Sequence, residues 1–128
     1  MSEFVIKGGQ ILEAGVLRAT DLLVRDGVIA QIGTGLNATR VLDAEGAVLT
    51  PGFVDLHVHL REPGDEDAET IETGARAAAL GGYTAVVAMP NTRPPLDDPI
   101  LVRAVQAIGA DAICEVISSG CITIGRDG

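Results

Sequence analysis

The chain has 128 residues, 47% of them hydrophobic and 21% charged, which is typical of an ordinary globular domain. Its net charge is −9, and no segment concentrates lysine or arginine, so nucleic-acid and anionic-membrane partners are not expected. No apolar run approaches the ~20 residues that cross a bilayer, and residues 1–4 do not begin a secretory leader, so we expect a cytoplasmic protein.

Residues 1–50 have the pattern of short β-strands joined by tight turns. Strands are expected at 4–6, ending at Gly8-Gly9, and at 22–25 and 28–32, on either side of Asp26-Gly27. An Asp-Gly pair between apolar runs is a strong indication of a β-hairpin. Two more short strands, 41–43 and 47–49, are expected around a second turn. We therefore expect a first domain, 1–50, that is an antiparallel β region.

Residues 51–128 alternate strand and helix patterns and form the second expected domain. Strands are expected at 53–60, 83–89 and 112–117, the last extending in one interpretation to 122. Helices are expected at 67–80, capped by Asp67 and ended by Gly81-Gly82, and at 100–108, entered through Pro99. This order predicts right-handed crossovers and a parallel sheet. The fold class is α/β, and the units are the start of an incomplete β/α barrel, which needs eight units and roughly 250 residues.

The segment 53–61 carries the residues with chemistry. Alternate residues of a strand face the same way, which predicts one face for Asp55, His57, His59 and Arg61. Two histidines spaced by one residue, about 6.5 Å apart between Cα atoms, can converge on one zinc ion. A half-exposed histidine pair without a metal is the simpler interpretation. However, these are the two histidines of the whole chain, and they close the first strand of the α/β region, which favours metal ligation.

Arg61 and Asn91 are the candidate substrate-binding residues. Each follows a strand on the side where catalytic groups of β/α barrels gather. A guanidinium binds a carboxylate through two hydrogen bonds, and an amide both donates and accepts. The alternatives are a solvated arginine and a turn-forming asparagine. Cys114 and Cys121 are interpreted as buried thiols rather than as a disulfide or a metal pair, although Cys121 could line the same mouth.

Three motifs resemble one enzyme family. Residues 50–64 resemble the opening of the amidohydrolase superfamily, and their Arg-Glu-Pro-Gly ending is similar to the dihydroorotase and allantoinase branch. Residues 69–82 and the Met-Pro-Asn-Thr run at 89–92 resemble class I dihydroorotase. The likeness extends over essentially the whole chain.

The resemblance implies a distorted TIM barrel preceded by part of a small β-sandwich. It implies a zinc-dependent enzyme, with one or two ions, that interconverts N-carbamoyl-L-aspartate and L-dihydroorotate in de novo pyrimidine biosynthesis. His57 and His59 match the first two zinc ligands of the family, and Arg61 and Asn91 match the groups that hold the substrate carboxylate. It also implies a homo-oligomer and allows an association with aspartate transcarbamoylase.

The sequence departs from the family pattern where further catalytic groups are expected. It has no third histidine, its one lysine is Lys7, and no residue matches the general base. Asp55 is interpreted as a structural hydrogen-bonding acid. We therefore expect these residues to be the N-terminal portion of the enzyme and inactive alone. Two alternatives stay open, an inactive dihydroorotase-like scaffold for aspartate transcarbamoylase and an allantoinase or hydantoinase.

Overall fold

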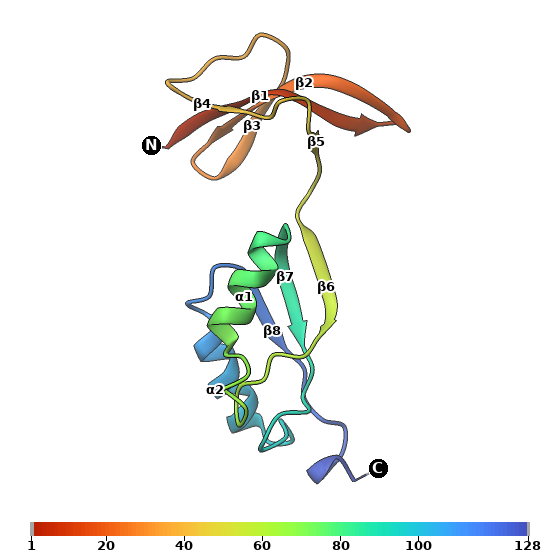
Figure 1. Cartoon of the computed structure of the whole chain (residues 1–128), viewed down its shortest axis with the longest axis vertical. Coiled ribbons are helices and arrows are strands. Elements are labelled where there is room, and N and C mark those ends of the chain that lie inside the picture. Colours follow the sequence, from red (N-terminus) through yellow and green to blue (C-terminus); the bar gives the residue numbers. More distant parts are fainter. Residues whose placement is uncertain (1, 128) are drawn as a thin grey trace. The chain divides into compact units, whose positions relative to one another are not determined.

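The computed structural model describes residues 2–127 and consists of two compact units, Met1–Pro51 and Gly52–Gly128. The first unit is a β-sheet and the second combines a sheet with helices (Figure 1). Together they form the mixed α/β architecture that the sequence predicts.

The first unit is a single mixed sheet of five strands. These are β1 (Glu3–Glu13), β2 (Val16–Arg25), β3 (Val28–Gly33), β4 (Arg40–Asp43) and β5 (Val48–Leu49), in the order β3-β2-β1-β4, with β5 also paired to β1. The hairpins β1–β2 and β2–β3 are antiparallel, but β4 and β5 run parallel to β1. The expectation of an entirely antiparallel region is therefore wrong.

Two turns explain the boundaries of these strands. Asp26 and Gly27 have φ angles of 48° and 81°, as a tight hairpin turn requires, so the predicted hairpin is confirmed. Strand β1 does not end at Gly8-Gly9 as expected. Gly8, with φ of 68°, lies within an irregularity between Ile6 and Gly9. The strand then continues to Glu13, and a second hairpin turn, which the sequence pattern did not predict, joins it to β2 at Val16.

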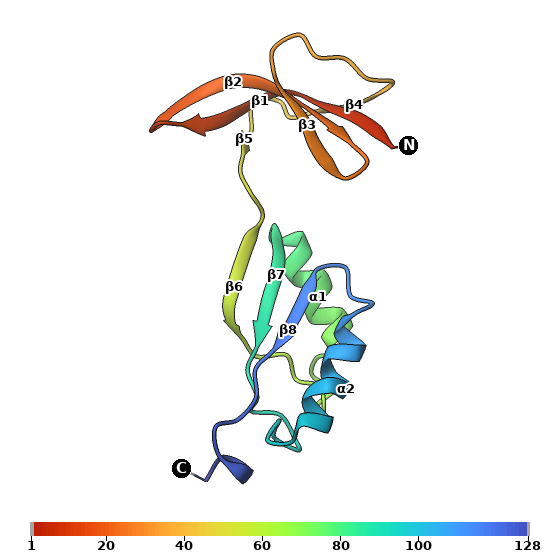
Figure 2. The same cartoon turned by 180° about the vertical axis from the view of Figure 1, so that it is seen from behind.

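The second unit is a three-stranded parallel sheet with helices on one face. Its elements are β6 (Phe53–Val58), α1 (Ile71–Leu80), β7 (Tyr83–Ala88), α2 (Pro99–Gly109), β8 (Glu115–Ser118) and the short 3₁₀ helix η1 (Ile124–Arg126). The sheet order is β6-β7-β8, and both pairs are parallel, which confirms the predicted parallel sheet. Figures 1 and 2, viewed from opposite sides, show α1 and α2 on the same face of the sheet.

The core of this unit lies between the sheet and the two helices. Its most completely buried side chains are Ile71 of α1, Val86 of β7 and Leu96 of the loop before α2. Val105 of α2 and Val116 of β8 complete the contact between layers. This packing fixes the ends of the strands, from which the candidate site is built. No helix among residues 2–127 combines the length and the apolar character needed to cross a membrane.

The first helix begins later than the sequence predicts. Thr70, not Asp67, is its N-cap, because the Thr70 and Thr73 side chains and backbone N–H groups form a reciprocal capping box. The second helix agrees with expectation, since the Asp98 side chain accepts a hydrogen bond from the Ile100 backbone N–H and Pro99 opens the first turn.

Strand β6 is also shorter and less regular than expected. It ends at Val58, so His59 and Arg61 belong to the segment that follows it. Asp55 is the Cα partner of Val86 and Val58 is that of Ala88, so two β6 residues lie opposite Val87 alone. This bulge interrupts strict alternation, and the expectation that Asp55, His57, His59 and Arg61 share one face of a regular strand is wrong.

Candidate functional site

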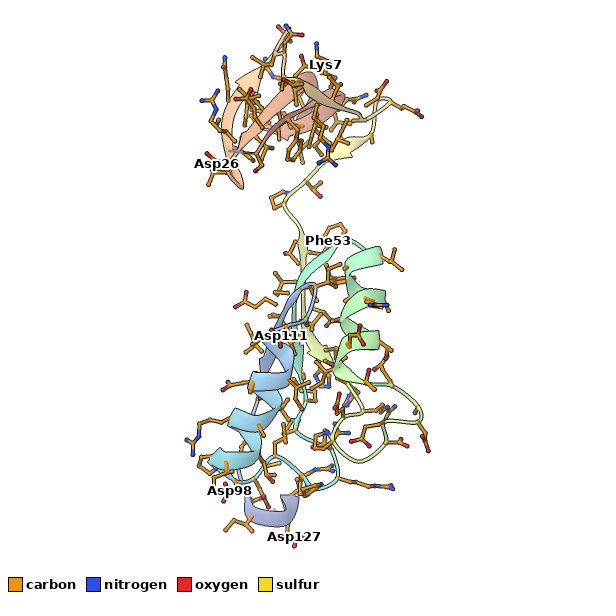
Figure 3. All side chains as sticks on the ribbon, turned by 90° about the vertical axis from the view of Figure 1, so that its left-hand side faces the viewer. Lys7, Asp26, Phe53, Asp98, Asp111 and Asp127 are labelled. Carbon is orange, nitrogen blue, oxygen red and sulfur yellow. The ribbon has the colours of Figure 1, made fainter. Side chains whose placement is uncertain are left out.

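The candidate site lies where the three parallel strands of the second unit end. In Figure 3, Phe53 marks the start of β6, whereas Asp98 and Asp127 lie near the opposite end of the unit. The loops at that opposite end are joined by backbone hydrogen bonds. Arg93 N donates to Pro63 O at 2.9 Å, linking the loops after β6 and β7, and Cys121 N donates to Leu96 O at 2.8 Å, linking the segment after β8.

His57 and His59 bring their imidazole rings together despite the irregular strand. The ring centroids are 5.1 Å apart and the planes meet at 61°. Two imidazoles on one tetrahedral zinc, with Zn–N bonds of 2.0–2.1 Å, place their centroids about 5 Å apart. The pair therefore fits a shared metal ion. Within residues 2–127, no group of three or more His, Cys, Asp or Glu side chains gathers to hold a metal, so the two histidines have no third candidate ligand beside them in this part of the chain.

Asn91 extends the histidine pair toward the loop after β7. Its Oδ1 lies 2.8 Å from Nδ1 of His59, across 32 positions of sequence. Asp55 contacts the pair differently, because its Oδ1 accepts a hydrogen bond from the His57 backbone N–H at 2.9 Å. The structure thus agrees with the interpretation of Asp55 as a structural hydrogen-bonding acid.

Three arginines gather at a pocket of about 290 Å³ beside these residues. His59, Arg61, Asn91, Arg93 and Arg126 all contribute to its lining. The ion pairs of residues 2–127 involve Arg18, Arg25 and Arg76, so the three pocket arginines have no acidic side chain within 4 Å. One carboxylate, that of Asp65, also lines the pocket, so three guanidiniums outnumber it and the positive balance favours an anionic ligand.

Two carboxylates hold the loop that carries Arg61. Glu62 Oε2 accepts a hydrogen bond from the Ile71 backbone N–H at 2.8 Å, the first turn of α1. Glu66 Oε1 accepts one from Gly64 N at 2.8 Å, and this bond, with a second from its own backbone N–H, lowers the pKa of the Glu66 carboxyl. The Glu62 and Glu66 carboxylates thus have structural roles in this loop.

The structure brings His59, Arg61 and Asn91 to one pocket, and His57 adjoins it through the ring of His59. Sequence reasoning missed Arg93 and Arg126. Arg93 follows Asn91 closely in the same loop and could have been found by that position. Arg126 lines the pocket from η1, beside Gly125, whose N–H donates to Asp97 Oδ2 at 2.6 Å, a contact that no pattern indicates. Cys114 is a buried free thiol, and the partly buried Cys121 thiol is also free and donates to Pro90 O at 3.6 Å.

Comparison with known proteins gives a family match over most of the chain. The family model described as dihydro-orotase-like matches residues 46–128. Over 130 residues the chain is 44% identical to the dihydroorotase of Pelobacter propionicus, covering 97% of this chain and 31% of that protein. Over 112 residues it is 54% identical to the dihydroorotase of Mycobacterium tuberculosis, covering 84% of this chain and 26% of that protein. The chain therefore spans less than a third of the length of these relatives.

Solved structures similar to this chain include hydantoinases. The L-hydantoinase (dihydropyrimidinase) of Arthrobacter aurescens is 28% identical, with a TM-score of 0.77, over 94% of this chain and 28% of that one. The D-hydantoinase (dihydropyrimidinase) of a Thermus species is 29% identical, with a TM-score of 0.71, over 93% of this chain and 27% of that one. Sequence and structure thus both indicate enzymes that act on cyclic amides.

Proposed function

Because this chain belongs to the dihydro-orotase-like family, we propose that it is the N-terminal portion of a zinc-dependent dihydroorotase. The reaction is the reversible conversion of N-carbamoyl-L-aspartate to L-dihydroorotate in de novo pyrimidine biosynthesis. The observation that carries the proposal is the convergence of the His57 and His59 rings beside a pocket that Arg61 and Asn91 also line. A metal-binding pair next to an anion-binding pocket suits hydrolysis of a cyclic amide that bears a carboxylate.

Two pairs of residues in this chain would have different roles, one pair binding the metal and the other binding the substrate. His57 and His59 would hold zinc, which polarises the scissile amide carbonyl as a Lewis acid when bound. Arg61 would pair with the substrate carboxylate through its planar guanidinium. The amide of Asn91, on the neighbouring loop, would donate a hydrogen bond to the same carboxylate. If the substrate were held by this carboxylate, the amide of its ring would lie next to the zinc held by His57 and His59.

The substrate assignment depends on the charge of the pocket. Hydantoin rings without a carboxylate offer nothing for a guanidinium to pair with, whereas dihydroorotate and carbamoyl-aspartate carry carboxylates. Arg61, Arg93 and Arg126 all line the pocket without an ion-pair partner among the described residues. This favours dihydroorotase over a hydantoinase or an allantoinase, although the similar solved structures are hydantoinases.

The architecture of the parent enzyme is part of the same proposal. We propose that β6, β7 and β8 are the first strands of a TIM barrel and that residues 1–50 are part of a small β-sandwich. The parent is a cytoplasmic homo-oligomer, and association with aspartate transcarbamoylase would be a further property of it. An inactive scaffold is less favoured, because a protein without catalytic activity does not require two converging histidines.

The decisive experiment places this chain in an active enzyme. The corresponding region of the Pelobacter propionicus dihydroorotase, which is 44% identical, is replaced by residues 1–128, and rates are compared on L-dihydroorotate, allantoin and hydantoin. We expect zinc-dependent turnover of L-dihydroorotate that His57→Asn and Arg61→Gln each reduce by at least 100-fold, roughly 3 kcal/mol of transition-state stabilisation. Faster turnover of hydantoin or allantoin would reject the substrate assignment. The isolated chain, with two metal ligands, is expected to show no turnover.

A further inference from the structure

We propose that Asn91 is a positioning residue for His59, in addition to its proposed contact with the substrate carboxylate. The observation is the 2.8 Å contact between Asn91 Oδ1 and His59 Nδ1. An amide oxygen only accepts hydrogen bonds, so the contact requires the proton of the neutral imidazole to be on Nδ1. The lone pair of His59 is then on Nε2, the nitrogen left to bind a metal. This role rests on the proposed zinc site.

The two histidines differ in a way that makes the effect of Asn91 specific. The His57 backbone N–H donates to Asp55, but within residues 2–127 the His57 ring has no hydrogen-bond partner. Both rings are exposed, so neither is held by burial. Only the ring of His59 has a neighbour that selects one tautomer, and metal-binding histidines in general are oriented by such a second hydrogen bond.

The amide group of Asn91 can serve both partners at once. With Oδ1 occupied by His59, the two N–H bonds of Nδ2 point away from the ring and are free to donate. Asn91 and Arg61 line the same pocket, where these donors would be available to a substrate carboxylate. One side chain would thus join the metal ligand to the substrate. Its two roles can be separated by substitution, because each uses a different atom.

The test reads the tautomer directly, by long-range ¹⁵N–¹H spectra of the imidazoles in the metal-free 128-residue chain at about pH 8, where free imidazole is neutral. Because the chain has two histidines, His57→Asn assigns both sets of signals. In the unsubstituted chain we expect His59 to carry its proton on Nδ1. In Asn91→Leu we expect it to move largely to Nε2, while His57 does not change. The backbone amide spectrum shows whether each variant keeps its fold, and Asn91→Ala removes the same oxygen with less bulk.

Two further variants separate positioning from substrate binding. Asn91→Asp keeps an acceptor oxygen and is expected to keep the Nδ1 proton of His59, although it loses the donor for a carboxylate. Arg61→Gln alters the pocket without touching His59 and should leave the tautomer unchanged. An Nε2 proton on His59 in the unsubstituted chain, or the same tautomer in Asn91→Leu, would overturn the proposal.

Zinc affinity, measured by competition with a fluorescent chelator, distinguishes this inference from the proposed function. We expect Asn91→Leu to weaken zinc binding by about 10–100-fold, as loss of an outer-shell partner usually does, and Asn91→Asp to keep it. If the unsubstituted chain binds no zinc, the proposed metal site fails. If it binds zinc and Asn91→Leu binds equally well, the metal site stands and the positioning role is wrong.

Discussion

At the scale of single residues, the loop between β6 and α1 depends on carboxylates that accept backbone hydrogen bonds. Glu62 reaches nine positions ahead to the N–H of Ile71, while Glu66 reaches two positions back to that of Gly64. Ile71 is fully buried, so removal of Glu62 takes away the acceptor of an N–H that belongs to a buried residue. Arg61 lies directly before Glu62, and its position therefore depends on the same contacts.

Glu62→Ala is expected to destabilise the second unit by about 1–3 kcal/mol, because it leaves a buried N–H without an acceptor. Urea unfolding of the chain, followed by circular dichroism, measures the change in free energy. Glu72→Ala is the matched control, since Glu72 is exposed and pairs only with Arg76 on the same helix, a pair of the kind worth about 0.3–0.5 kcal/mol. Equal losses for the two variants would show that Glu62 is not a structural cap.

The stability of this loop depends on pH through the ionisation of the Glu66 carboxyl. The hydrogen bond from Gly64 N, and that from its own backbone N–H, stabilise the ionised carboxyl and lower its pKa from the ordinary value of 4.5. A lowered folded-state pKa means that this stabilisation is fully present above about pH 4.5 and is lost as pH falls through the lower folded value. We expect the Gly64 amide signal in ¹⁵N spectra to titrate with a midpoint below 4.5, and Glu66→Gln to abolish that titration. A midpoint at or above 4.5 would contradict the loop geometry.

At the scale of elements, helix α1 approaches the segment that follows β6 closely because Gly74 has no side chain. A Cβ at this position would overlap Leu60 Cδ2 and come within 3.1 Å of the Glu69 carboxyl carbon. Leu60 is buried and lies between His59 and Arg61. The packing of α1 therefore fixes the backbone on which these two site residues lie.

Gly74→Ala is expected to destabilise the second unit by about 1–2 kcal/mol, although alanine is the better helix former by about 0.5–1 kcal/mol. The steric overlap with Leu60 is expected to destabilise the unit by more than the higher helix propensity of alanine stabilises it. Amide spectra should also show shifts at His59 and Arg61. Ala77→Gly, at an exposed position of the same helix, should cost about 1 kcal/mol through propensity alone and leave these two residues unchanged. A stabilised Gly74→Ala protein would mean that α1 packs less closely than described.

The same elements show which features of the fold and the site can be predicted from sequence patterns. The Asp26-Gly27 hairpin, the parallel order β6-β7-β8 and the capping of α2 by Asp98 were all predictable, because short-range turn and cap chemistry determines them. The start of α1 was not, since residues 62–69 make loop contacts that only the folded chain brings together. The parallel pairing of β4 with β1 likewise joins distant segments. Of the site, Arg126 was not predictable, because the contact beside it joins distant segments, whereas Arg93 could have been found from its position two residues after Asn91.

At the scale of the whole molecule, net charge and exposed apolar surface oppose each other. Helices cover one face of the sheet in the second unit, and Figure 2 shows the other face uncovered. On the strands of this sheet, Val54, Leu56 and Ile117 are exposed at 54%, 73% and 42%. The first unit likewise exposes apolar side chains of β2 and β3, among them Leu17, Val28, Ile29 and Ile32. Contiguous apolar surface and open strand edges favour association, whereas a net charge of −9 disfavours it.

The chain is therefore expected to self-associate, and more strongly as salt screens its negative charge, because the Debye length falls from about 10 Å at 0.1 M to 3 Å at 1 M. Sedimentation velocity at both salt concentrations measures the effect. Leu56→Asn combined with Ile117→Asn should weaken association by removing apolar area from the open sheet face, while Leu80→Asn, at 91% exposure on the end of α1, should change it little. If the chain sediments as a monomer at both concentrations, or if Leu80→Asn has the larger effect, the open face of the β6–β8 sheet is not the surface through which copies meet.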